Sequence, residues 1–215
     1  QAPPAGRVVA AIGATGFLLS HETNDAFIAV NRLLGNGEEV YWLTELTEAA
    51  GATRGPGTMF IPAGPETEDT LRTAAAELGL TFIGVREPPV GPALKLRPVR
   101  IGLWDRYGGS MPSGWLRWIL EEFEFPFEPV FPQTLDTANL ASAYDVLIFV
   151  TGAIPDQDRA TRGSQGAPRP TRETVPEEFH DRLGAVTVGE TVPKLRAFVE
   201  QGGTLLALGT STSLA

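Results

Sequence analysis

Near its C-terminal end the chain carries a run of small residues that could position a nucleophile. The run Gly209-Thr210-Ser211-Thr212-Ser213 follows residues 204–208, an apolar segment typical of a buried strand. Hydrolase-like α/β folds place a nucleophile at such a strand-to-helix corner, because small neighbours permit the strained turn. Ser211 is therefore a candidate nucleophile. The alternative is that Ser211 is a structural turn or cap residue, since Ser213 stands where an elbow has its second glycine.

An activated serine needs a base within hydrogen-bond reach, and histidine is the usual one. The chain has two histidines, His21 and His180, and neither follows Ser211. Neither begins an HxxE pair, so we expect no zinc site in this chain, because hydrolytic zinc needs about three protein ligands. The absence of cysteine also excludes disulfides, thiolate metal sites and a cysteine nucleophile.

A second candidate site is the loop that joins residues 100–104, a predicted strand, to a helix starting near Ser113. A strand's carboxyl end followed by a helix N-terminus can receive an anion on backbone N–H groups. The glycines match neither GxGxxG nor a P-loop, so nucleotide binding is weakly supported and a structural loop is the alternative. We expect a pocket, if there is one, at this sheet edge together with Thr151 and Ser211. The candidate ligand-binding residues are Asp105, Arg106, Tyr107, Gly108, Gly109, Ser110, Ser113 and Thr151.

The composition limits the partners of the chain. Its 215 residues carry 17 basic and 26 acidic side chains, a formal net charge of −9. Nucleic-acid-binding proteins concentrate Lys and Arg, so a nucleic-acid partner is not expected. No apolar run reaches the roughly 18 residues that span a bilayer, and a homo-oligomer is possible. The sequence does not indicate whether Gln1 and Ala215 are natural ends.

Strand-like and helix-like segments alternate along the chain, which predicts an α/β fold with a mostly parallel sheet and helices on both faces. Four prolines within residues 86–98 indicate a connector between residues 1–97 and residues 98–215, two α/β segments whose strands could share one sheet. Helices are expected from about residue 25 to 34, 66 to 78, 113 to 123 and 189 to 201. Strands are expected at residues 8–12, 39–43, 58–63, 81–85, 100–104, 128–131, 145–150 and 204–208.

Two segments have further expectations attached. Residues 151–176 hold Arg159, Arg162, Arg169 and Arg172 among glycines and prolines, which indicates a solvated loop or, alternatively, a lid or partner-docking arm. The helix after Ser113 carries Trp115, Ile119 and Phe123 at helical spacing, with Ser113 as its N-cap. The four tryptophans are interpreted mainly as core or subdomain contacts.

Three stretches resemble a known family. They are Arg100–Asp105 with Gly108-Gly109-Ser110-Met111-Pro112-Ser113-Gly114-Trp115-Leu116-Arg117-Trp118, then Tyr144-Asp145-Val146-Leu147-Ile148-Phe149, and Phe198-Val199-Glu200-Gln201-Gly202-Gly203-Thr204-Leu205. Together they resemble the non-catalytic C-terminal region of large bacterial zinc carboxypeptidases of the carboxypeptidase-A-like family, a class I glutamine-amidotransferase-like domain.

The resemblance implies a three-layer flavodoxin-like fold, a periplasmic or extracellular parent enzyme, and zinc in the peptidase domain of that parent, which would be the partner. Ser211 stands where working amidotransferases have cysteine, and their following His and Glu are missing. We therefore expect a non-catalytic accessory domain without a cofactor of its own. The alternatives are an amidotransferase-like or serine-type hydrolase that uses Ser211, or a small-ligand-binding α/β module.

Overall fold

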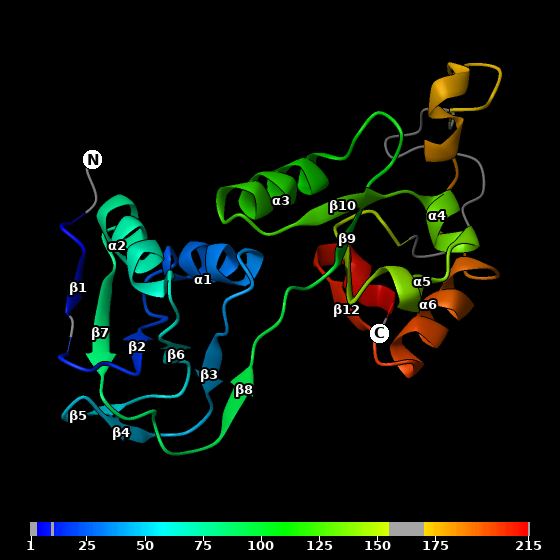
Figure 1. Ribbon diagram of the computed structural model, residues 1–215. Helices are drawn as coiled ribbons and strands as arrows, with labels where there is room; N and C mark the ends of the chain where they lie inside the picture. Colours follow the sequence, from blue (N-terminus) through cyan, green and yellow to red (C-terminus); the bar gives the residue numbers. More distant parts are fainter. Residues whose placement is uncertain (1–3, 10, 155–169, 215) are drawn as a thin grey trace. The chain divides into compact units, whose positions relative to one another are not determined.

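The chain folds as two compact units, each with its own sheet. The computed structural model describes residues 4–9, 11–154 and 170–214 (Figure 1). Unit 1 consists of Gln1–Pro98 with Phe123–Phe125, and unit 2 of Val99–Glu122 with Pro126–Ala215. The α/β class predicted from the sequence is confirmed, since each unit contains a sheet together with helices. We describe each unit separately.

Unit 1 contains a mixed sheet in the order β1-β7-β2-β6-β3-β8. Only β1 and β7 pair in parallel, and the other four pairings are antiparallel. The expectation of a mostly parallel sheet is therefore wrong for this unit, because β2, which was not predicted, and β3 run in the opposite direction to β1, β6, β7 and β8. Its strands are β1 (Arg7–Val9), β2 (Gly16–Leu19), β3 (Tyr41–Leu43), β6 (Met59–Pro62), β7 (Thr81–Val85) and β8 (Ala93–Lys95), with a separate hairpin of β4 (Thr47–Ala49) and β5 (Ala52–Arg54).

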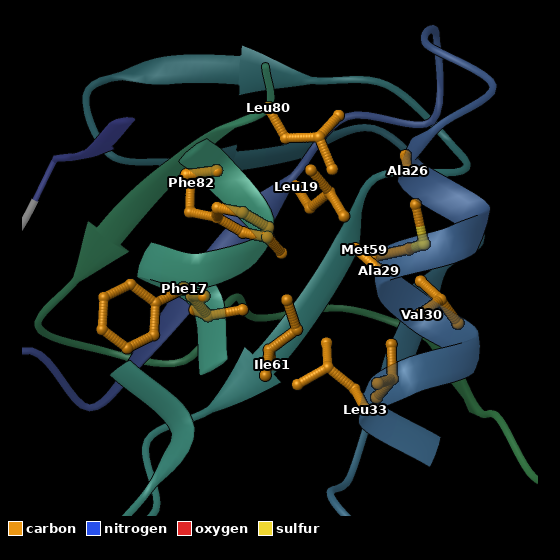
Figure 2. Packing of buried hydrophobic residues seen from close by; sticks show 14 residues of the cluster. Phe17, Leu19, Ala26, Ala29, Val30, Leu33, Met59, Ile61, Leu80 and Phe82 are labelled. Carbon is orange, nitrogen blue, oxygen red and sulfur yellow. The ribbon is translucent and has the colours of Figure 1, made fainter. Parts of the chain in front are cut away.

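The core of unit 1 lies between this sheet and two helices, α1 (Ala26–Gly35) and α2 (Thr67–Leu78). Figure 2 shows Phe17, Leu19 and Ile61 on the strands, with Ala29 and Leu33 of α1 within the same apolar cluster. Helix α2 ends at Gly79, whose φ of 69° is the left-handed conformation that glycine adopts at low cost. Both helices begin and end within about one residue of their predicted bounds, whereas β1 ends at Val9, three residues before its predicted end.

Unit 2 contains a four-stranded sheet in the order β10-β9-β11-β12, and every pairing in it is parallel. The strands match the sequence expectation closely. They are β9 (Ile101–Trp104), β10 (Phe127–Val130), β11 (Val146–Phe149) and β12 (Thr204–Ala207). The helical segments are α3 (Met111–Glu122), α4 (Pro132–Thr137), α5 (Leu140–Ala143), α6 (Thr191–Glu200), η1 (Glu177–Arg182) and η2 (Gly209–Leu214).

Helix α3 departs from its prediction in two ways. It begins at Met111, so Ser113 lies inside the first turn and is not the N-cap. The buried residues of α3 are Ser113 and Leu120, whereas Trp115 is 63% and Ile119 is 42% exposed. The stripe of apolar residues that the periodicity identified is therefore on the outward side of the helix. Helix α6 packs with Leu195 and Phe198 buried, whereas the neighbouring Val199 is exposed.

Residues 123–125 belong to unit 1 through polar contacts with α1. The guanidinium of Arg32 donates to both carboxylate oxygens of Glu124 and to Glu77, and the Asn31 amide donates to the Phe123 carbonyl at 2.8 Å. The hydrogen bonds from Arg32 lower the pKa of Glu124 below its usual range. Glu124 itself has a φ of 55°, a conformation that is uncommon for a residue with a Cβ atom.

Gly16 provides a test of the packing in unit 1. A Cβ atom at Gly16 would lie 2.4 Å from the Phe60 ring and 2.7 Å from the Ile61 carbonyl oxygen. We expect Gly16→Ala to lower the free energy of unfolding by about 1–3 kcal/mol because of this overpacking. Gly35→Ala is the matched control, since no atom lies within 4 Å of its Cβ position. Urea unfolding that shows equal stability for both variants would contradict the packing described here.

The Arg32–Glu124 pair predicts a pH dependence. Because the folded-state pKa of Glu124 is lowered, its contribution is present above the unfolded pKa and is lost as the pH falls through the folded value. Both side chains are partly exposed, so we expect Glu124→Gln to cost at most about 1 kcal/mol at pH 7. Urea unfolding of the two proteins should show a smaller difference at pH 3 than at pH 7, because Glu124 becomes protonated as the pH falls. A difference that is the same at both pH values would contradict the ion pair.

Candidate functional site

The candidate residues lie at the carboxyl edge of the unit 2 sheet. Because β9, β10, β11 and β12 are parallel, the segments that follow them emerge at the same edge. These segments contain Asp105 after β9, Thr151 after β11 and Ser211 after β12. The hydrogen bonds of this edge define two internally connected groups.

The first group is the connection between β11 and β12. Ser211 is fully buried, and its hydroxyl donates to the Val150 carbonyl at 2.5 Å while accepting from the Ile154 N–H at 3.3 Å. The neighbouring Thr210 hydroxyl accepts from the Gly152 N–H at 3.0 Å. The segment after β12 is thereby attached to the segment after β11 through side chains. The only proton of the Ser211 hydroxyl is directed at a backbone carbonyl.

Gly209 allows this attachment. Its φ is 59°, and a Cβ atom there would lie 2.0 Å from the Thr151 hydroxyl oxygen. Thr151 and Gly209 are both exposed, so the two loops approach each other at the surface, whereas Ser211 is buried. The glycine that suggested a nucleophile elbow is thus needed for the close approach of two loops.

The second group is the loop after β9. Asp105 is buried, and its carboxylate accepts from the Arg106 N–H at 2.8 Å and lies 3.9 Å from the Arg117 guanidinium. The Arg106 side chain donates to the Gly109 carbonyl at 3.0 Å. The Asp105 N–H donates to the Val130 carbonyl, which connects this loop to the end of β10. The loop is therefore closed by bonds within itself and to its neighbours.

The remaining candidates of this loop are placed as follows. Gly108 and Gly109 both have left-handed φ values, 79° and 78°, with open space around their Cβ positions. The Ser110 carbonyl accepts from the Gly114 N–H at 2.8 Å. The Ser113 hydroxyl is buried and donates to the Trp104 carbonyl, which fastens the first turn of α3 to the end of β9. Ser113 thus has a structural contact in place of a cap.

Sequence reasoning missed an aromatic and cationic group at the same edge. The Arg182 guanidinium lies 5.3 Å from the ring centre of Phe131 and 5.0 Å from that of Phe179. Tyr107 contacts Phe179 with 5.9 Å between ring centres. The available signal was weak: Phe131 is the last residue of a predicted strand, and Phe179 and Arg182 are three residues apart on a short helix.

His180 has a structural environment as well. Its Nε2 lies 3.1 Å from the Arg172 carbonyl and 2.9 Å from the Val175 carbonyl, and the Gln133 amide donates to the His180 carbonyl at 2.7 Å. As the Nε2–H tautomer, the ring donates to these carbonyls and orders the segment before η1. His180 lies on η1, a short helix without buried residues. Arg159, Arg162 and Arg169 of the predicted arm lie outside the described residues.

His21 belongs to unit 1, where its ring packs against Trp42 with 5.8 Å between ring centres. Within residues 4–9, 11–154 and 170–214, no group of three or more His, Asp or Glu side chains is arranged to hold a metal ion. In the same ranges, no helix combines the length and apolar character needed to cross a bilayer.

Comparison with models of protein families, with curated proteins and with solved structures finds no match to this chain. The arguments about function therefore depend on the geometry of the edge and on the residues that carry the resemblance described above.

The buried Ser211 hydroxyl provides a test of the first group. Ser211→Ala removes one donor and one acceptor and leaves the Val150 carbonyl and the Ile154 N–H without this partner. We expect a loss of about 1–3 kcal/mol in the free energy of unfolding. The control is Ser213→Ala, since Ser213 is exposed and its hydroxyl donates to the Thr210 carbonyl at 3.0 Å within η2. Equal stability of the two variants in urea would contradict a structural role for Ser211.

Proposed function

We propose that this chain is a non-catalytic accessory domain of an exported bacterial zinc carboxypeptidase, and that it serves in packing, substrate presentation or partner docking. The observation that supports the proposal is the environment of Ser211. A serine nucleophile transfers its proton to a base, whereas this hydroxyl donates to the Val150 carbonyl and belongs to a fully buried residue. Ser211, at the nucleophile position, instead joins two loops through its hydrogen bonds.

The resemblance to the C-terminal amidotransferase-like region of these enzymes supports the rest of the proposal. The unit 2 order β10-β9-β11-β12 corresponds to strands 2-1-3-4 of a flavodoxin-like sheet, and we propose the three-layer arrangement of that fold. The handedness of parallel crossovers then assigns α3 to one face of the sheet and α4, α5 and α6 to the other. The contacts of α6 with α4, α5 and β12 agree with this assignment.

The proposal places the protein in the periplasm or outside the cell, and it makes the peptidase domain of the same protein the first expected partner. Zinc would be held by that domain. The chain itself would contribute surface: it carries a net charge of −9 and large exposed apolar side chains on α3. Both are features through which one domain recognises another.

A small-ligand-binding module is the second candidate, and one observation favours it. Gly108 and Gly109 are consecutive left-handed residues at the carboxyl edge, with open space beside them. Glycine lets a ligand approach the backbone closely, and the Gly109 N–H is itself used in a hydrogen bond to the Arg106 carbonyl at 2.9 Å. The buried Asp105 carboxylate at the start of the same loop disfavours an anion there, so a neutral or cationic ligand would suit the site better.

The proposal predicts that the isolated chain is inert in three assays. It should hydrolyse no C-terminal residue from peptides, bind no stoichiometric zinc by elemental analysis, and take up no fluorophosphonate probe at Ser211. Ser211→Ala is the control for the probe, since any labelling that persists in it occurs elsewhere. Labelling of the parent chain that Ser211→Ala abolishes would establish the serine-hydrolase alternative and overturn the proposal.

A positive test uses the gene that encodes the chain. Sequencing the reading frame upstream of the first codon should reveal an HxxE-containing peptidase domain fused to this one. An unrelated domain in that position would contradict the link to a carboxypeptidase, and it would leave the structural role of Ser211 unaffected.

A further inference from the structure

Helix α3 carries large apolar side chains on the side that faces away from its own sheet. Met111, Trp115, Trp118 and Ile119 follow one another at helical spacing, and they are 79%, 63%, 55% and 42% exposed. The buried residues Ser113 and Leu120 mark the opposite side. Trp115 and Trp118 contact each other edge to face at 6.2 Å. A solvent-facing helix side normally carries charged and polar residues, so this side is unusual for an isolated domain.

The sheet of unit 2 has a matching exposed region. The register places Leu103, Ile148 and Leu206 on one face of the sheet, and Leu208 follows with the same alternation. Leu103 and Ile148 are buried, whereas Leu206 and Leu208 are each 46% exposed. This face is therefore also apolar at β12, but the side chains of β12 on it are not covered by another element in the described part of the unit.

This face is the one that the three-layer arrangement assigns to α3. The opposite face contains Gly102, whose Cβ position is surrounded by Leu147, Val130 and the ring of Tyr144, the residue that follows α5. Leu205 and Ala207 of β12 point to that same opposite face and are less exposed than Leu206. The face with α4, α5 and α6 is therefore closed, and the α3 face is open on the β12 side.

The widths of the sheet and of a helix explain why part of this face is uncovered. Four strands about 4.8 Å apart present a face of roughly 19 Å, and one helix with its side chains is about 10 Å wide. Helix α3 connects β9 to β10 and contacts β9, so it covers about half of the face. A parallel sheet is normally covered on both faces. Ile148 of β11 is buried on this face, so the uncovered part lies over the edge strand β12 and beside it, where one more helix can pack.

We propose that a second copy of this chain supplies that helix. A two-fold axis that runs between and along the two α3 helices places each helix against β9 of its own sheet and against β12 of the partner's sheet. The outward side of α3, with Trp115 and Trp118, then packs on Leu206 and Leu208 of the other copy. The interface is isologous, as in most homodimers, because the same surface supplies both the helix and its receiving strands.

The area available is sufficient for a stable dimer. At roughly 200 Å² for a large apolar side chain, the exposed fractions of Met111, Trp115, Trp118, Ile119, Leu206 and Leu208 come to about 650 Å² per copy. A specific interface of standard size buries about 800 Å² per partner, and flanking main chain and polar rim residues add to the apolar centre. Two tryptophans at that centre are the residue type most often found to dominate binding energy. The inference depends on the three-layer arrangement, and it holds whether or not the parent is a peptidase.

Sedimentation equilibrium of residues 1–215 over about 1–500 µM tests this proposal. The wild-type chain should be a concentration-dependent dimer. Trp118→Glu, on the helix, and Leu206→Glu, on the receiving strand, should each raise the dissociation constant at least about tenfold, because either places a carboxylate in the apolar centre. Val90→Glu is the control, since Val90 is 90% exposed in unit 1. Circular dichroism should show all three variants folded.

Three results would overturn the proposal. They are a wild-type chain that stays monomeric over the whole range, a dimer that neither variant weakens, and a dimer that Trp118→Glu disrupts while Leu206→Glu does not. A monomeric chain that binds a peptidase domain through Trp118 would also overturn it, and would assign the same surface to that domain. Absence of zinc and of probe labelling bears only on the proposed function, so the two sets of experiments fail independently.

Discussion

The structure of unit 2 depends on the requirement that both faces of a parallel sheet be covered. The strands β9 and β11 are central in the order β10-β9-β11-β12, and their side chains are apolar on both sides. Leu147 and Phe149 on one face are almost completely buried, while the other face runs from buried Leu103 to half-exposed Leu206. Burial of apolar side chains therefore drives the folding of this unit. One face of the sheet is largely buried, whereas the other remains partly exposed at β12.

At the carboxyl edge of the same sheet, a tight turn of the kind that holds catalytic nucleophiles in other proteins has a structural role. The turn after β12 is compact because Gly209 adopts a left-handed conformation against Thr151. Ser211 then reaches back to the segment after β11 and bonds to two backbone groups there. Similarly, Ser113 fastens α3 to the end of β9 through the Trp104 carbonyl. Buried hydroxyls at both loops satisfy backbone groups that burial would otherwise leave without partners.

Much of the secondary structure could be predicted from the sequence, because it depends on local pattern. The strand Thr81–Val85 was predicted at its observed bounds, and α2 ends at Gly79 as expected. Segments of three or four residues such as β2 and β8 were missed, since their pairing partners are distant in sequence and so short a run has no periodicity. The direction of strand pairing in unit 1 was wrong for the same reason.

The orientation of α3 could not be predicted, although its position was. Leu116 and Leu120 lie on one side and Trp115 and Ile119 on the other, so the helix has two apolar sides and periodicity alone does not rank them. The sequence located the edge that carries Asp105, Thr151 and Ser211, because that follows from parallel topology. It did not reveal the group of Tyr107, Phe131, Phe179 and Arg182, because that group depends on how residues 170–183 return to the sheet.

Hydrogen–deuterium exchange at low and high protein concentration tests directly whether another copy of α3 completes the α3 face of unit 2. Amides of β12 (Thr204–Ala207) and of α3 should become more protected at high concentration, whereas those of α1 in unit 1 should not change. Protection of β12 and α3 that is independent of concentration would contradict the claim.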